Sequence, residues 1–270
     1  MESRRKVPLM EPVTPRQTDI LDLARRDGRV EVEKLAAGFD VTPQTIRKDL
    51  NDLCERGLLQ RVHGGAVSPS SVSNWAYESR RNLAEEEKRR IGRVAASLIP
   101  ENSSIMLNIG TTTEQVAVSL RHHEGLMAIT NNINVANILR EAPGVEVIIA
   151  GGLVRASDGG VVGEATVDFM RQFKVDYAVI GASAIDADGT IFDYDFREVR
   201  VSREIMKHAR FTILVADKMK FERNAPVRIG HLSEINFFVT DEMPPDPIMK
   251  ICRENDVRVE IAGENPGATT

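Results

Sequence analysis

The sequence has few of the residues that mark secreted, metal-binding or membrane proteins. Its 270 residues include two cysteines, one tryptophan and five histidines. Cys54 and Cys252 stand apart, without the spacing of a zinc site, so we expect two reduced thiols, no disulfide, no metal and no cofactor. No apolar run approaches the ~18 residues that cross a membrane, and the basic start, residues 1–13, lacks the apolar core of a signal peptide. We therefore expect a cytoplasmic protein without a membrane partner.

Strong charge of either sign is also missing, since the formal net charge is −5 at pH 7. Residues 1–68 carry 12 Lys and Arg against 11 Asp and Glu, and the remainder carries 23 against 29. The beginning is compatible with a polyanionic partner but lacks the strongly basic signature of many nucleic-acid-binding domains. Apolar and charged residues are plentiful, at 42% and 28%, which is enough for one large or two smaller folded domains.

Residues 14–69 have the pattern of three short helices followed by a β-hairpin. Thr14 and Gln17 fit a capping box at the start of the first helix, and Gly28 ends that helix. The stretch VEKLAAGFD supplies a second, shorter helix. LLQRVHGGAV then alternates apolar and polar residues around a Gly64–Gly65 turn. This order predicts a winged helix-turn-helix.

The third helix, in VTPQTIRKDLNDL, has one apolar stripe and one uncommitted polar face. Thr42 can cap the helix, and the proline after it suits the first helical position. Ile46, Leu50 and Leu53 repeat at helical spacing and commit one face to a core. The other face can enter a DNA major groove, which makes the recognition motif about residues 31–50. The residues that we expect to contact operator double-stranded DNA are Thr42, Gln44, Thr45, Arg47 and Lys48 on this helix and Arg61 and His63 on the wing.

An ordinary three-helix bundle with a solvated polar face is the alternative interpretation of the same pattern. In the DNA-binding interpretation, Gln44 pairs with adenine and Arg47 with guanine or phosphate. The hairpin, and the separate domain that follows it, favour DNA binding.

The chain changes character twice after the wing. The stretch SPSSVSNWAY is rich in serine and has no period, which indicates a linker over residues 70–84. Over residues 85–262, apolar runs such as IMLNIG, LMAIT and VEVIIAGG alternate with helical patterns. That alternation predicts βαβ units, and so an α/β domain whose mostly parallel sheet is buried on both faces.

Polar residues follow five of the predicted strands, where a parallel sheet brings its strand ends to one rim. After IMLNI, Gly110 permits close backbone approach, and three threonines bring hydroxyls and free amides to the start of a helix, which suits a phosphate. For this turn alone, a threonine-rich helix cap is the alternative. Asparagine amides can satisfy hydroxyls and Lys220 can neutralise phosphate, so the rim predicts a site for a small phosphorylated polyol or sugar. The expected contacts are Gly110, Thr111, Thr112, Thr113, Asn131, Asn132, Gly151, Gly152, Gly181, Ser183 and Lys220.

The third helix also resembles a family signature. The motif T-x-x-TIRKDL, which starts at Thr42, together with Arg16 and RVHGGA, is similar to the DeoR family of bacterial sugar-metabolism repressors. The resemblance implies that this helix binds the operator and that the protein is a homodimer or homotetramer. It also implies that Asp49 holds the helix or its arginine neighbour in place, because a carboxylate facing phosphate would be repelled.

The rest of the chain resembles the sensor domain of that family throughout and, more distantly, the ribose-5-phosphate isomerase fold. In that enzyme the loop matching IGASAID carries acidic residues, but Ile180 and Ser183 stand at those places here. Glu204, interpreted as a partner of Arg203, does not complete a proton-transfer site by itself. We therefore expect binding without turnover, and an isomerase is the less favoured alternative.

Four further stretches resemble family members that control glycerol 3-phosphate genes: TNNINVANIL, IIAGGLVRASDGGVVGEATVDFMRQF, IFDYDFREVR and FERNAPVRIG. This resemblance implies a repressor of glycerol and glycerol 3-phosphate metabolism genes that glycerol 3-phosphate releases from its operator. A repressor that responds to a different sugar phosphate is the alternative. Glu198 matches an acidic position on a helix that closes the pocket, where the resemblance implies a contact with an effector hydroxyl, Arg197 or Arg200.

Overall fold

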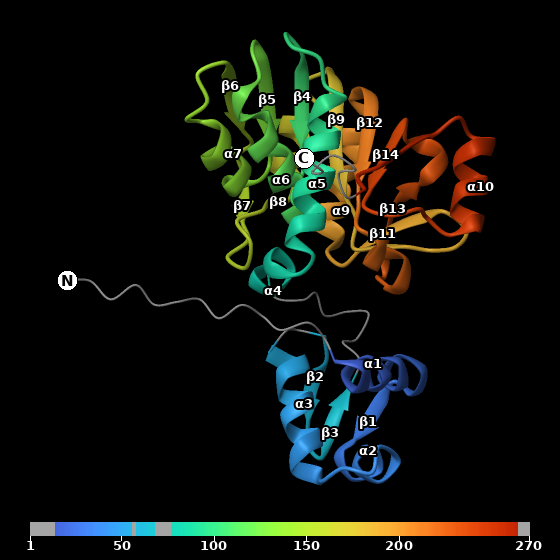
Figure 1. Cartoon of the computed structure of the whole chain (residues 1–270). Helices are drawn as coiled ribbons and strands as arrows, with labels where there is room; N and C mark the ends of the chain where they lie inside the picture. Colours follow the sequence, from blue (N-terminus) through green and yellow to red (C-terminus); the bar gives the residue numbers. More distant parts are fainter. Residues whose placement is uncertain (1–13, 56–57, 68–76, 264–270) are drawn as a thin grey trace, which may run out of the picture. The chain divides into compact units, whose positions relative to one another are not determined.

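The chain divides into two compact units, Met1–Trp75 and Ala76–Thr270, and each is described by itself (Figure 1). The computed structural model describes residues 14–55, 58–67 and 77–263. The first part of the range interpreted as a linker, 70–84, lies outside these residues. A short helix that the sequence did not predict, α4 (Tyr77–Asn82), follows within the same range.

The first unit is a winged helix-turn-helix, as the sequence predicted. Three helices and three short antiparallel strands share one core, and the strand order is β1-β3-β2. The elements are α1 (Pro15–Asp27), β1 (Arg29–Glu31), α2 (Val32–Gly38), α3 (Pro43–Glu55), β2 (Gln60–Val62) and β3 (Gly65–Val67). Strand β1 was not predicted, because three residues are too few for a readable period.

Local rules set the helix ends of this unit. Thr14 Oγ1 accepts a hydrogen bond from the Gln17 amide at 3.2 Å, and Gln17 Oε1 accepts one from the Thr14 amide at 3.0 Å, which confirms the capping box. Gly28 ends α1 at φ 73°, a left-handed conformation that glycine adopts without a Cβ clash. The apolar stripe of α3 is also confirmed, because none of its three side chains is exposed: Ile46, Leu50 and Leu53.

The wing turns one residue earlier than predicted. Val62 pairs with Gly65, so the two-residue turn is His63–Gly64, and its glycine has φ 77°. Gly65 is instead the first residue of β3, where a Cβ would lie 2.0 Å from the Val30 carbonyl oxygen on β1. Close packing of strands, and not the turn, therefore requires the second glycine.

The second unit is an α/β domain built on a seven-stranded sheet, as predicted. All neighbouring strands are parallel, in the order β15-β14-β12-β9-β4-β5-β6. The strands are β4 (Ser104–Leu107), β5 (Leu126–Thr130), β6 (Val145–Ile149), β9 (Val175–Gly181), β12 (Ala209–Val215), β14 (Phe237–Thr240) and β15 (Arg258–Ile261). The chain order reverses between β4 and β9, and ligands of such sheets bind beyond the carboxyl ends of the strands at this point.

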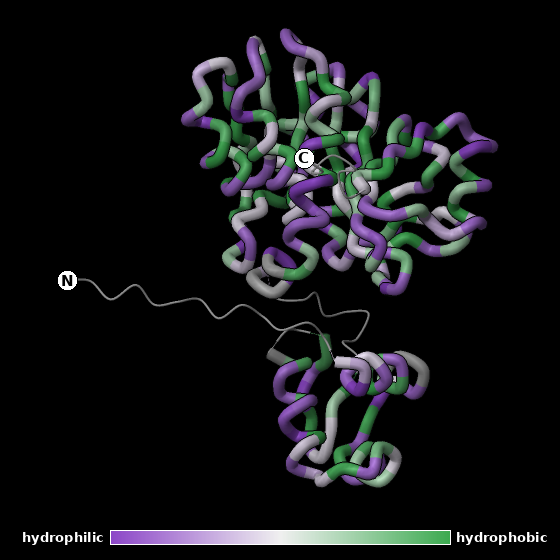
Figure 2. The backbone as a smooth tube through the Cα atoms, viewed as in Figure 1, coloured by the Kyte–Doolittle hydropathy of each residue, from purple (hydrophilic) through white to green (hydrophobic). Residues whose placement is uncertain are grey.

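Two apolar clusters cover the two faces of this sheet, and apolar colour runs along its strands in Figure 2. Within β4, Ile105 and Leu107 join the cluster under α5, α6 and α7, whereas Met106 joins the cluster under α8 and α9. Burial on both faces explains the near-continuous apolar runs of the sequence. The helices are α5 (Glu85–Ser97), α6 (Thr111–Ser119), α7 (Ile133–Leu139), α8 (Glu164–Met170), α9 (Phe196–Lys207) and α10 (Asp246–Glu254).

Two small antiparallel additions to the second unit were not predicted. One is the pair β7 (Leu153–Val154) and β8 (Val161–Val162), and the other is the sheet β10 (Ala184–Ile185), β11 (Thr190–Asp193) and β13 (Val227–His231). Three short 3₁₀ helices complete the unit: η1 (Leu120–His122), η2 (Lys218–Glu222) and η3 (Leu232–Glu234).

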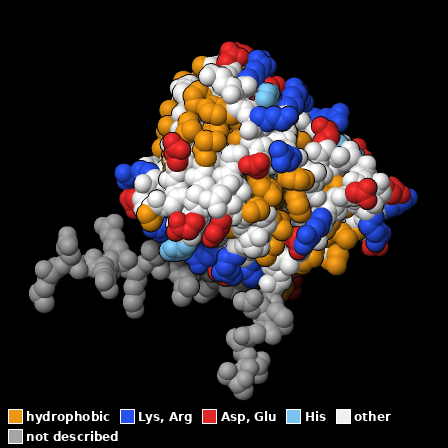
Figure 3. All heavy atoms as spheres, turned by 90° about the horizontal axis from the view of Figure 1, so that it is seen from above, with side chains coloured by type: hydrophobic (Ala, Val, Ile, Leu, Met, Phe, Trp, Pro, Cys, Tyr) orange, Lys and Arg blue, Asp and Glu red, His pale blue; other side chains and the backbone are white. Residues whose placement is uncertain are grey.

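Cys252 is a buried free thiol, and Cys54 is half-buried. Of the helices in the described part of the chain, none is both long and apolar enough to cross a bilayer. Within the same residues, no group of three or more histidines, cysteines and carboxylates is placed to hold a metal ion. The face seen in Figure 3 has basic and acidic side chains interspersed, so its charge is mixed.

Candidate DNA-binding face and effector site

The polar face of α3 is exposed and makes few internal contacts. Thr42 Oγ1 accepts a hydrogen bond from the Thr45 amide at 3.2 Å, which confirms the predicted cap and places the two hydroxyl oxygens 2.9 Å apart. Gln44, Arg47 and Lys48 are exposed beyond this cap. Helical geometry therefore gathers the five predicted DNA-contacting residues of α3 at its amino-terminal half.

Arg47 has one long ion pair, at 3.6 Å to Glu33 of α2. The two side chains are 47% and 75% exposed, so water screens the pair and it stabilises the fold by less than ~1 kcal/mol. Arg47 can therefore leave Glu33 for a base or a phosphate at little cost.

The two predicted wing residues, Arg61 and His63, are also exposed. Arg29 of β1 donates a hydrogen bond to the His63 carbonyl oxygen at 3.2 Å, which ties the turn of the wing to the rest of the unit. The wing is thus held by a contact that the sequence did not indicate.

Asp49 holds its helix in place, which is one of the two expected roles. Its carboxylate accepts a hydrogen bond from Arg16 of α1 at 2.6 Å, so its partner lies on another helix and is not an arginine neighbour on α3. This contact raises the pKa of Arg16, through the hydrogen bond first and through charge as well. Gln17 donates to Asp52 at 2.8 Å, so two polar contacts fix α3 against α1 and leave the opposite face free.

The turn after β4 has the geometry of an anion site. Gly110 has φ 153°, and α6 begins at the next residue, where the first amides of a helix have no partner four residues earlier. Thr111 and Thr112 are buried beside it. Thr113 is fully buried, and its hydroxyl donates to the carbonyl oxygens of Asn108 and Gly110, so this threonine braces the turn with its side chain.

Several other predicted rim residues lie around this turn. A Cβ on Gly181 would lie 3.9 Å from Thr113 Cγ2, which places the end of β9 beside α6. Asn132 donates to Glu114 Oε1 at 3.2 Å and accepts from the Asn134 amide, so its side chain is committed to the first turns of α6 and α7.

Ser183 lies between β9 and β10, and Lys220 lies on η2 after β12. The Ser183 hydroxyl donates to Asp193 at 3.1 Å, and Lys220 Nζ lies 3.8 Å from Asp217 Oδ2. Gly151 and Gly152 follow β6 and lie against Thr166 of α8, whose hydroxyl donates to the Gly151 carbonyl oxygen at 3.0 Å.

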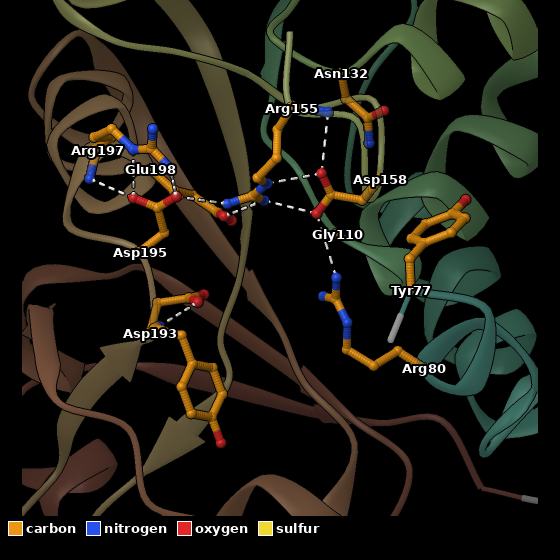
Figure 4. A network of polar contacts seen from close by, with 12 residues as sticks. Tyr77, Arg80, Gly110, Asn132, Arg155, Asp158, Asp193, Asp195, Arg197 and Glu198 are labelled. Carbon is orange, nitrogen blue, oxygen red and sulfur yellow. Dashed lines mark hydrogen bonds and ion pairs between the residues drawn. The ribbon is translucent and has the colours of Figure 1, made fainter. Parts of the chain in front are cut away.

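A buried network, which the sequence did not reveal, lies over the rim (Figure 4). The Arg155 guanidinium donates to Asp158 at 2.7 and 2.8 Å, to Asp195 at 3.1 Å and to Glu198 at 2.6 Å. The only local signal for this network in the sequence was that Arg155 and Asp158 stand at the two ends of a four-residue stretch in a glycine-rich loop. Glu198 is thus held by Arg155, whereas Arg197 pairs with Asp195 and Arg200 with Glu164, so the expected contacts with Arg197 and Arg200 are wrong.

Burial shifts the pKa of several charged groups in this region. Burial raises the pKa of Glu198 to about 8, with a further rise from the charge of Asp193, whose own pKa burial also raises. Burial lowers the pKa of Lys220 to about 7, and Asp217 offsets part of that effect. Burial likewise lowers the pKa of Lys88 to about 8. Burial thus disfavours the charged forms of carboxyl groups and amines in one region, where the charges of Arg80 and Lys220 also act on Asp193.

Helix α4 contacts α6, α7 and the loop that carries Arg155 and Asp158. The Tyr77 hydroxyl donates to Glu114 at 2.7 Å and accepts from Asn134 at 3.1 Å. Arg80 contacts Asp158 at 3.3 Å. The first turn of α6 and the loop of Arg155 are therefore connected through the helix that begins directly after residues 68–76.

The pair of Glu204 and Arg203, which the comparison with the isomerase suggested, is not formed. Glu204 pairs with Arg171 and Lys207 and not with Arg203, which donates to the Ile229 carbonyl oxygen. Ile180 is buried in the apolar core.

Both units match known domains. Residues 16–72 match the DeoR-like helix-turn-helix domain, and residues 83–242 match the DeoR C terminal sensor domain. A solved structure of ribose 5 phosphate isomerase A from Neisseria gonorrhoeae is also similar, with 13% identity and a TM-score of 0.38 over 52% of this chain and 54% of that chain.

Curated relatives are similar over nearly the whole chain. The glycerol-3-phosphate regulon repressor of Escherichia coli is 43% identical over 92% of this chain and 98% of its own length. That of Haemophilus influenzae is 46% identical, over 91% and 96%. The HTH-type transcriptional repressor CsqR of Escherichia coli is 38% identical, over 93% and 96%. A winged helix-turn-helix followed by a parallel α/β unit, with these matches over both, shows that the chain belongs to the DeoR family.

Proposed function

We propose that the protein represses genes of glycerol and glycerol 3-phosphate metabolism and that glycerol 3-phosphate releases it from its operator. The observation that carries the proposal is the 43–46% identity, over more than nine-tenths of the chain, to proteins named as glycerol-3-phosphate regulon repressors. We further infer that the protein acts in the cytoplasm and catalyses no reaction.

In this proposal α3 enters the major groove of the operator. Gln44 reads adenine, Arg47 reads guanine or contacts phosphate, and the remaining predicted residues contact the backbone. One such unit offers few base contacts, so two or four copies of the chain bind repeated half-sites. The exposure of the α3 polar face supports this arrangement.

The effector occupies the carboxyl ends of β4 and β9. Its phosphate lies at the Gly110 turn, where the amides of α6 and the charge of Lys220 stabilise it. Its binding disturbs the contacts of Glu114 and Asp158 with α4, which directly follows the segment from the DNA-binding unit. Release of DNA then requires that the effector favours the altered state by ~1–3 kcal/mol.

The test is a gel-shift assay with the region upstream of a glycerol-uptake operon. We expect a retarded band that glycerol 3-phosphate abolishes at a concentration at which ribose 5-phosphate and inorganic phosphate leave it intact. If only another sugar phosphate abolished the retarded band, the effector would be that compound, and the assignment as a repressor would stand. Absence of retardation with any glycerol operon would refute the proposed gene class.

A further inference from the structure

Two buried amide oxygens of the second unit have no hydrogen-bond partner. Asn108 is 2% exposed and Asn131 is not exposed at all, yet neither Oδ1 atom is bonded within the part of the chain that the structure describes. Buried polar atoms are nearly always paired, and an unpaired acceptor lowers stability. A donor for these two oxygens must therefore come from outside the described residues.

The surrounding contacts fix which amide atoms are left over. Asn108 Nδ2 donates to Ser202 Oγ at 2.7 Å, and Ser202 uses its own proton to donate to the Glu198 carbonyl oxygen at 3.1 Å. Asn131 Nδ2 donates to the Val161 carbonyl oxygen at 3.1 Å. Exchanging oxygen and nitrogen in either amide would break these bonds, so both unpaired atoms are acceptors.

The two asparagines are neighbours at the rim. Leu107 and Thr130 are the last paired residues of β4 and β5, so Asn108 and Asn131 stand one position further along adjacent strands, which are spaced about 4.8 Å apart. Residues two positions earlier on each strand, Met106 and Ile129, belong to the same apolar cluster. Alternation along the strands therefore places both asparagines on the face covered by α8 and α9.

This face is also that of the proposed effector site. Asn108 stands two residues before Gly110, and its carbonyl oxygen accepts the Thr113 hydroxyl that braces the turn. Through Ser202 it lies one helical turn from Glu198 on α9. Asn108 thus connects the Gly110 turn with α9, and Asn131 stands beside it on the next strand.

We propose that the side-chain oxygens of Asn108 and Asn131 accept hydrogen bonds from hydroxyl groups on neighbouring carbons of the effector. The proposal rests on the proposed function, because the Gly110 turn must hold the phosphate. Two adjacent acceptors without partners favour a ligand that offers hydroxyl donors. They disfavour a ligand that presents a carboxylate or an unsubstituted carbon there. The site therefore selects phosphorylated polyols against phosphorylated acids and simple alkyl phosphates. Asn108 was not among the predicted contacts, although a polar residue within the apolar run IMLNI was a signal for it.

The experiment measures binding to the full-length protein by calorimetry. The probes are glycerol 3-phosphate, propyl phosphate, which lacks both hydroxyls, and 3-phosphoglycerate, which presents a carboxylate. We expect both analogues to bind at least tenfold more weakly than glycerol 3-phosphate. This comparison uses the wild-type protein, so it decides the proposal even where a variant does not fold.

Variants then test whether the two asparagines cause the preference for glycerol 3-phosphate over propyl phosphate. In Asn108→Leu and in Asn131→Leu, the ratio of the affinities for glycerol 3-phosphate and propyl phosphate should fall below threefold. Asn137→Leu changes an exposed asparagine of α7 and should keep the wild-type ratio. Circular dichroism checks that each variant is folded.

Each outcome separates this proposal from the proposed function. Equal binding of glycerol 3-phosphate and propyl phosphate would overturn the proposal, leave the phosphate site intact and indicate that the two oxygens hold buried water. A wild-type ratio in both folded leucine variants would also overturn it. Failure of every phosphate compound to bind would instead refute the effector site itself.

Discussion

The two units of this protein differ in how exposed their polar side chains are and in how many internal contacts those side chains make. On α3, Gln44, Arg47 and Lys48 are exposed, and the ion pair of Arg47 with Glu33 is long and solvated. In the sensor unit, the side chain of Arg155 is 16% exposed and contacts three carboxylates within 3.1 Å. The side chains on α3 therefore need little rearrangement to meet DNA, whereas a ligand that contacts Arg155 must replace existing bonds.

The size of each partner explains this difference. Duplex DNA carries one charge per ~1.7 Å of its axis and attracts exposed cations over a distance. A small metabolite has only a few charges and hydroxyls, so tight binding requires a site that excludes water. Most groups buried for that purpose have partners in the free state, and replacing those partners couples ligand binding to a change of structure.

The largest effect is expected from removing the cation of the buried network. Arg155→Met leaves Asp158, Asp195 and Glu198 without their shared partner, and the free energy of unfolding of the second unit should fall by ~3–5 kcal/mol. Urea denaturation followed by circular dichroism measures it. Arg140→Met, which removes an arginine that is 65% exposed, should cost less than ~0.5 kcal/mol. Equal losses in the two variants would mean that the network is not a buried unit.

The exposed face should show a loss of binding without a loss of stability. Arg47→Ala should weaken operator binding by ~1–3 kcal/mol, because it removes a base or phosphate contact, and should leave the affinity for glycerol 3-phosphate and the urea midpoint unchanged. Fluorescence anisotropy with labelled operator measures the change, and Arg140→Ala is the charge-matched control. Unchanged operator affinity would show that α3 is not the recognition helix.

The sensor site should respond to pH through Lys220, whose pKa burial lowers to about 7. Below pH 7 the ammonium is charged and stabilises the phosphate, and above pH 7 it loses its proton. The charged fraction falls about fiftyfold between pH 7 and 9, so the affinity for glycerol 3-phosphate should fall by up to that factor, or ~2.3 kcal/mol. Calorimetry at several pH values measures this fall. Lys220→Arg keeps its charge over that range and should remove the decline. A decline of the same size in the arginine variant would assign the titration to another group.

The smallest effect is expected at α4, where the hydroxyl of Tyr77 joins this helix to α6 and α7. Tyr77→Phe removes the hydrogen bonds with Glu114 and Asn134, each worth ~0.5–1.5 kcal/mol. The glycerol 3-phosphate concentration that releases half of the operator should change several-fold, with little change in operator affinity without effector. Tyr177→Phe, on β9, makes the same chemical change away from these contacts. A matching shift in that control would exclude α4 as the connection.

Features that depend on neighbours in the chain were predicted well. The capping box of Thr14 and Gln17, the stripe of α3 and the run of parallel strands all follow from spacing over a few residues. The strand β1 and the pair β7 and β8 were missed, because two or three residues show no period. The partner of Asp49 was missed for another reason, since Arg16 lies 33 residues away and belongs to a different helix.

The sequence by itself determined the two-unit organisation, the polar face of α3 and the glycine and threonine turn after β4, because helical and strand periods and helix starts are local properties of a chain. Only the tertiary structure decided that Arg155 holds Glu198, that Thr113 and Asn132 are committed to internal bonds and that Asn108 and Asn131 keep free acceptors side by side. Whether a polar group is paired depends on what folding places within about 3 Å of it, and sequence spacing does not specify that distance for residues on different elements.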